Sequence, residues 1–119
     1  MTPLEIALVC WLIACGVAGL LQVLAAHGVG ERSAWGVAVG WQREIALWNF
    51  ALCVGISYAL LSRDEACKTL IARIVAILSV VLGVNHVLAW RSRPATTHKL
   101  GMVANAAGFA LILWGLLFR

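Results

Sequence analysis

Amide, carboxylate and imidazole side chains interrupt three of the apolar segments of this chain, and they gather near one end of each of the three. They are Gln42, Glu44, Asn49, Asn85, His86 and Asn105. Such groups can hydrogen-bond a ligand, coordinate a metal or move protons, and in hydrocarbon they are costly unless they are paired or face water. These residues are therefore the candidate ligand-binding residues of the chain.

Metal binding and acid–base chemistry are the most specific functions that these residue types allow. A metal ion would use His86 and Glu44, with His27 or His98 brought in from a loop. Within the apolar segments no two such ligands are three or four residues apart, so the sequence contains no preassembled pair. His86 and Glu44 could also relay protons. Because no nucleophile–base motif, phosphate-cradling loop or dinucleotide fingerprint is present, no catalytic residue is predicted and no cofactor is assigned.

Four apolar segments of the chain must position these side chains. The segments are residues 3–26, 42–61, 70–90 and 100–118. A helix crosses a bilayer with about 20 mostly apolar residues at ~1.5 Å rise each, which is close to the length of every segment. The chain is 63% hydrophobic and 12% charged, with a mean hydropathy of +0.96. We predict an all-α integral membrane four-helix bundle, in which residues 1–119 form a single multi-pass domain.

An even number of spans places both termini on the same side of the membrane. We call this the T side, and it also carries the second loop, residues 62–69. The opposite P side carries the first loop, residues 27–41, and the third, residues 91–99. Helical rise places Asn49, Asn85, His86 and Asn105 within about 5–12 Å of the P-side interface. The Lys and Arg residues divide four to five between the sides, so they do not set the orientation.

Helical spacing limits which of these side chains can meet. Gln42 and Asn49 are seven residues apart and share a face, whereas Glu44 lies about 140° away from Asn49 around the helix. Glu44 and Asn49 therefore cannot both point at the centre of the bundle. Asn85 and His86 are about 100° apart, so we expect one to face inward and the other to face a neighbouring helix.

Three interpretations of the polar residues remain open. They could form interhelical hydrogen bonds, each worth about 0.6–2 kcal/mol. They could line a P-side pocket for a quinone, a lipid headgroup or a haem, or they could hold a metal. The leading hypothesis is a structural or accessory subunit that self-associates, joins a larger membrane complex or binds a membrane lipid. The alternative is a redox or transport component with a small ligand in one leaflet. Nucleic-acid binding is not expected, because no basic run is interleaved with aromatic residues.

One stretch also resembles a known family. Gly40-Trp41-Gln42-Arg43-Glu44-Ile45, followed by Asn49 and by Gly83 with His86 three residues later, is similar to a pattern in small prokaryotic four-helix membrane proteins of unknown function. That family is similar in size and helix count to DoxX-like proteins, some of which are associated with quinone-linked oxidation. The resemblance implies a prokaryotic inner-membrane protein with Gln42, Glu44, Asn49 and His86 as motif residues. The chain departs from the pattern at Ala46, where glycine is expected, and in lacking a gap after Gly40-Trp41.

Overall fold

The computed structural model describes residues 1–118, most of which are helical. The helices are α1 (Pro3–Leu24), α2 (Ala26–Glu31), α3 (Val39–Ser62), α4 (Glu65–Ser92) and α5 (Thr96–Leu117). All except α2 are long and apolar enough to cross a membrane, with hydropathies of 1.7 to 2.3 in their best 18-residue windows. The predicted all-α bundle with four long apolar helices is confirmed.

The helix ends differ from the predicted spans because capping and chain geometry, rather than hydropathy, decide where a helix begins. α4 starts at Glu65 and not at residue 70, since the Asp64 carboxylate accepts a hydrogen bond from the backbone N–H of Ala66 at 2.9 Å. Lys68, which the sequence placed in the second loop, is therefore helical. The first loop is also shorter than predicted, because residues 26–31 form α2 and α3 already begins at Val39.

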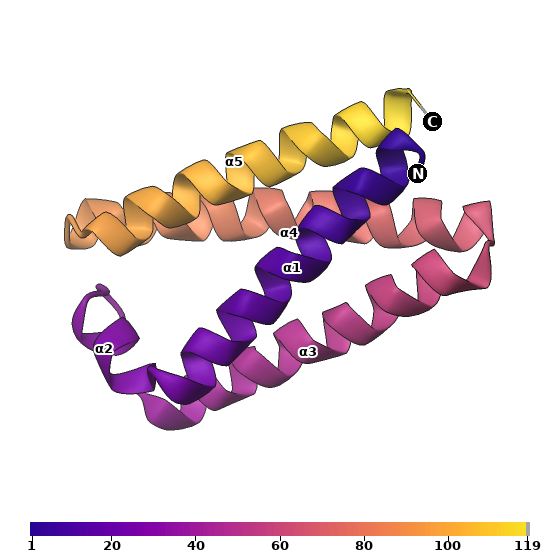
Figure 1. Ribbon diagram of the computed structural model, residues 1–119. Helices are drawn as coiled ribbons and strands as arrows, with labels where there is room; N and C mark the ends of the chain where they lie inside the picture. Colours follow the sequence, from indigo (N-terminus) through magenta and orange to yellow (C-terminus); the bar gives the residue numbers. More distant parts are fainter. Residues whose placement is uncertain (119) are drawn as a thin grey trace.

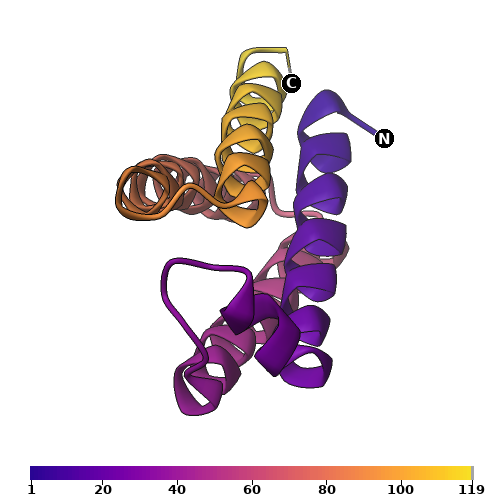
Figure 2. The same ribbon diagram turned by 90° about the vertical axis from the view of Figure 1, so that its left-hand side faces the viewer.

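The long helices are arranged as two pairs, α1 with α3 and α4 with α5 (Figure 1). α1 runs diagonally through the bundle, so its N-terminal part lies beside the end of α5 and its C-terminal part lies beside the start of α3. The two pairs approach each other at the T side and diverge toward the P side, where α2 and the loop after it lie (Figures 1 and 2).

The tightest packing is in the T-side half of the bundle. Leu4, Leu8, Ile56, Val75 and Ile112 are completely buried there and contribute residues from all four long helices. In lipid, where there is no water to exclude, such contacts stabilise the bundle through van der Waals packing between the helices. This core joins the two helix pairs at one end and leaves the other end free to form a site.

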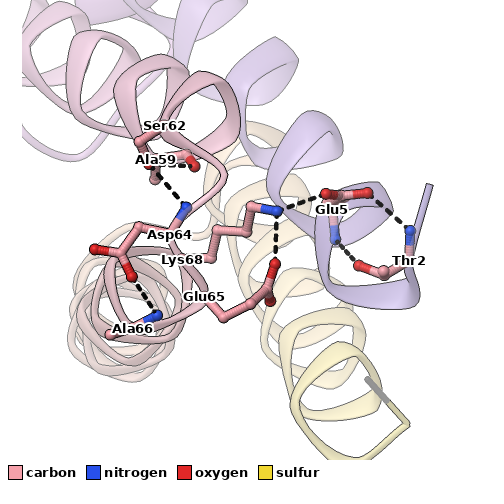
Figure 3. Close-up of polar contacts among 8 residues, drawn as sticks. All are labelled: Thr2, Glu5, Ala59, Ser62, Asp64, Glu65, Ala66 and Lys68. Atoms are coloured by element: carbon pink, nitrogen blue, oxygen red, sulfur yellow. Dashed lines mark hydrogen bonds and ion pairs between the residues drawn. The ribbon is translucent and has the colours of Figure 1, made fainter.

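An ion-pair cluster around the buried Lys68 joins the starts of α1 and α4 at the same end (Figure 3). The Lys68 ammonium is 2.6 Å from a carboxylate oxygen of Glu5 and 2.8 Å from one of Glu65, and Lys68 is only 3% exposed. Glu5 is itself held by the capping box of α1, in which its carboxylate accepts a hydrogen bond from the Thr2 backbone N–H at 2.9 Å.

Replacement of Lys68 by methionine is expected to destabilise the bundle, because Glu5 and Glu65 would lose their shared cation while Glu5 stays partly buried. The measurement is the midpoint of unfolding in a detergent titration, followed by circular dichroism. Arg73→Met is the matched control, since Arg73 is an exposed cation on the same helix, and it should change stability by less than about 0.5 kcal/mol. Equal midpoints for the two variants would contradict a role of the cluster in stability.

Candidate functional site

A cavity of about 770 Å³ lies between the two helix pairs and extends from the P-side end of the bundle to just past its middle. Five of the six predicted site residues line it: Gln42, Asn49, Asn85, His86 and Asn105. They come from α3, α4 and α5, so the structure brings together side chains that are up to 63 residues apart in the chain. Asn85 and His86 both line the cavity, which differs from the expectation that only one would face inward.

Glu44 is placed elsewhere. Its side chain is exposed and is not among the residues that line the cavity. The reason is the angular separation along α3, because Gln42, Ala46 and Asn49 follow the inward side of the helix while Glu44 is turned away from them. The sequence pattern therefore predicted one residue, Glu44, that does not line this cavity.

The amides around the cavity differ in how they are satisfied. The Asn49 side chain donates to the side-chain oxygen (Oε1) of Gln22 at 2.9 Å, which links α3 to α1. The Asn105 side chain donates to the backbone carbonyl of Gly101 at 2.8 Å. Gln42 is only 9% exposed, and its side-chain oxygen has no hydrogen-bond partner within residues 1–118. A buried amide oxygen without a hydrogen bond is unusual, because a buried polar atom that lacks its partner costs about 1–3 kcal/mol.

A histidine pair lies at the P-side end of the cavity. The Nδ1 atoms of His86 and His98 are 3.3 Å apart, and His98 is completely buried. The indole of Trp35 packs against both imidazoles, with ring centroids 5.1 Å from His86 and 4.7 Å from His98. A side chain at Gly101 would collide with the His86 ring, so glycine is what allows this imidazole to lie against α5.

The loop between α2 and α3, residues 32–38, covers this end and is called the cover loop below. The Ala34 backbone N–H donates to Nε2 of His98 at 2.7 Å, and the Arg93 guanidinium donates to the Ser33 carbonyl at 3.3 Å. Gly36 has a φ of 73°, a conformation that glycine adopts without strain, and it also lines the cavity. The cover loop connects α2 to α3 in the chain, but its hydrogen bonds anchor it to residues of the other helix pair, α4 and α5.

The deeper end of the cavity is apolar and is lined mostly by small or aromatic residues. They include Cys10, Trp11, Ala14, Cys15, Ala18, Ala104, Ala107, Gly108 and Leu111. The Trp11 indole N–H donates to the backbone carbonyl of Gly108 at 3.2 Å and closes the floor between α1 and α5. Ala14 and Ala104, near the middle of their helices, are exposed residues of this lining.

The weak metal site predicted from His86 and Glu44 is not assembled, since only His86 lines the cavity. Within residues 1–118, no three His, Cys, Asp or Glu side chains lie close enough to hold a metal ion. Of the two loop histidines considered, His98 joins His86 and His27 is exposed. The arrangement is one of hydrogen-bonding groups rather than of metal ligands.

Comparison of the chain with family models, with curated proteins and with solved structures gives no match. The resemblance to the four-helix family and to DoxX-like proteins stays a prediction.

Sequence reasoning did not place Trp35 or Trp11 at the cavity, and it offered the approach of His98 to His86 only as one of two alternatives for a metal site. That contact joins residues 12 apart across the turn from α4 to α5, a relation that helical periodicity within one helix does not reveal. A usable signal was nevertheless present: Gly101 lies three residues after His98, and small residues mark places where a bulky group lies against a helix.

Proposed function

We propose that this protein binds a small lipid-soluble molecule in the cavity between its helix pairs, within the P-side leaflet. The observation that carries the proposal is the division of one cavity into an apolar deep end and a polar end covered by a loop. A molecule with an apolar body and a polar head matches this division. The volume of about 770 Å³ is within the range of about 300–1,000 Å³ typical of small-molecule sites.

The hydrogen bonding supports binding over a purely structural role. Interhelical bonds account for Asn49 and for the two histidines, and Asn105 is satisfied within its own helix. Within residues 1–118 the Gln42 side-chain oxygen has no such partner, although it is buried. Polar groups that serve only to join helices would be expected to be paired, because hydrocarbon offers them no water.

The proposal joins parts of both earlier hypotheses. A quinone and a neutral membrane lipid both have an apolar body and a polar head, as the cavity requires. For a metal ion, His86 is the one residue of the predicted pair that lines the cavity. Binding also fits an accessory subunit that holds a lipid, alone, as a homo-oligomer or in a larger membrane complex. The prokaryotic inner membrane as its location rests on the family resemblance alone.

Native mass spectrometry of the protein extracted in a mild detergent tests the proposal. We expect a reproducible added mass of a lipid-soluble molecule, strongly reduced in His86→Ala and retained in His27→Ala. His27 is the matched control because it is exposed and does not line the cavity. A defined oligomer or partner mass without any small molecule would favour the purely structural subunit instead.

A further inference from the structure

The backbone of the cover loop decides which nitrogen atoms of the histidine pair carry a proton. The Ala34 N–H can only donate, so Nε2 of His98, 2.7 Å away, must be an unprotonated acceptor. His98 is then neutral, carries its ring proton on Nδ1 and donates it to Nδ1 of His86, 3.3 Å away. Because Nδ1 of His86 accepts this bond, the His86 ring is neutral too and carries its own proton on Nε2.

The Nε2–H of His86 is a free donor at the wall of the cavity. His86 lines the cavity, and within residues 1–118 its hydrogen bonding is limited to the contact with His98. The polar side-chain atoms that the described chain encloses without a partner are Oε1 of Gln42 and Nε1 of Trp90. Nε2 of His86 is not one of these enclosed atoms, so a molecule in the cavity can reach it.

Neighbouring groups hold this donor in one direction. A Cβ atom at Gly101 would lie about equally far from both ring nitrogens of His86 and from the carbon between them. The glycine therefore lies against the face of the ring and leaves its edge free. The Trp35 indole packs on the same ring with centroids 5.1 Å apart, and the bond to His98 opposes its rotation. A donor fixed before the ligand arrives loses little conformational entropy on binding.

The charges around the cavity restrict the head group further. Among residues 1–118, no Asp, Glu, Lys or Arg lines the cavity. The Arg93 guanidinium donates to the Ser33 carbonyl, and the Lys99 ammonium lies 5.7 Å from the centre of the Trp90 ring. A charged head in this cavity would be taken out of water without an opposite charge, which is strongly unfavourable.

From these features we propose that the cavity selects an uncharged lipid whose head presents an acceptor oxygen, such as a carbonyl, to the Nε2–H of His86. The inference rests on the proposed function and names its ligand class. The alkyl body occupies the apolar end of the cavity between α1 and α5. Long-chain ketones and esters have this chemistry. Hydrocarbons lack the acceptor, and anionic lipids carry a charge that the lining does not balance.

Two isosteric ligands test the requirement for an acceptor. Heptadecan-2-one has a carbonyl group, and 2-methylheptadec-1-ene has a methylene group in place of the oxygen. Binding of tritiated heptadecan-2-one to the protein in uncharged detergent micelles is measured by scintillation proximity, with the unlabelled alkene as competitor at known mole fraction in the micelle. We expect the ketone to bind about three- to tenfold more tightly, as one neutral hydrogen bond provides. Hexadecyl sulfate, an anionic competitor, should bind most weakly.

The variant His86→Phe identifies the donor. It should bind the ketone and the alkene within about twofold of each other, and its retained binding of both shows that it is folded. His27→Phe is the matched control and should keep the wild-type preference, because His27 is exposed and does not line the cavity. Asn85 is the rival donor, since it is exposed and lines the cavity, so Asn85→Leu should also keep the preference.

Nitrogen NMR of the wild-type protein with ¹⁵N-labelled histidine provides a test that needs no variant at position 86. A protonated and an unprotonated ring nitrogen have distinct chemical shifts. We expect the proton on Nδ1 of His98 and on Nε2 of His86. Heptadecan-2-one should shift the Nε2 resonance of His86, whereas 2-methylheptadec-1-ene should leave it unchanged. An unprotonated Nε2 of His86 would contradict the inference even if His86→Phe does not fold.

The outcomes separate this inference from the proposed function. Equal binding of ketone and alkene by the wild-type protein, or tighter binding of hexadecyl sulfate, would overturn the head-group assignment and leave a lipid-soluble ligand in place. An unchanged preference in folded His86→Phe, or its loss in Asn85→Leu, would overturn the assignment to His86. Failure of the ketone and the alkene to bind, with no small molecule co-purifying, would overturn the proposed function itself.

Discussion

The substitution Ala104→Phe is expected to abolish ligand binding while the helix bundle stays folded. Ala104 lines the cavity and is exposed, so the added ring has room to enter the space that the ligand would occupy. Loss of that space should weaken binding by at least about tenfold, which corresponds to about 1.4 kcal/mol. The measurement is the bound fraction of the co-purifying small molecule by native mass spectrometry.

Ala106→Phe is the matched control for this substitution. Ala106 is also an exposed alanine of α5, but it does not line the cavity, and at about 200° from Ala104 around the helix it is on the other face. It should retain the ligand, and both variants should keep the helical circular dichroism of the parent. Full retention of the ligand by a folded Ala104→Phe protein would show that binding takes place elsewhere.

The positions of the four long helices could be predicted from the sequence because the bilayer fixes their length. The depth of the polar residues also followed from helical rise, and the structure places Gln42, Asn49, Asn85, His86 and Asn105 around one cavity. That they bind a ligand stays a prediction. Glu44 shows the limit of a depth argument, since a residue at the right depth can still lie on the outward face.

The ion pairs of Lys68 and the position of the cover loop could not be predicted from hydropathy, because both depend on local backbone geometry. Lys68 reaches Glu5 only because α4 begins early, at the Asp64 cap, which brings Lys68 into its first turn three residues after Glu65. The cover loop depends on α2 and on a positive φ at Gly36, which together turn the chain back over the α4–α5 pair. Neither the cap nor the turn is visible in a count of apolar residues.

The angle between the helix pairs rests on a close approach at the T side, and Gly115 is the residue that permits it. A Cβ atom at Gly115 would lie 2.9 Å from the Cα of Leu4 and 3.2 Å from the carbonyl oxygen of Pro3. Both are backbone atoms, so relief requires α1 to move away from α5 rather than a side chain to rotate. Because α1 and α5 also form walls of the cavity, this contact connects the stability of the bundle with the shape of the site.

Gly115→Ala is therefore expected to destabilise the bundle by about 1–3 kcal/mol, the usual cost of overpacking. The comparison is with Gly40→Ala in α3, where a Cβ atom would meet nothing within 4 Å. Alanine is intrinsically the better helix former, so Gly40→Ala should be neutral or stabilising by up to about 1 kcal/mol. The free energy of unfolding from a detergent titration gives the difference, and equal values would contradict the close approach. Weaker ligand binding by folded Gly115→Ala would further show that the T-side contact sets the width of the cavity, because this residue does not itself line it.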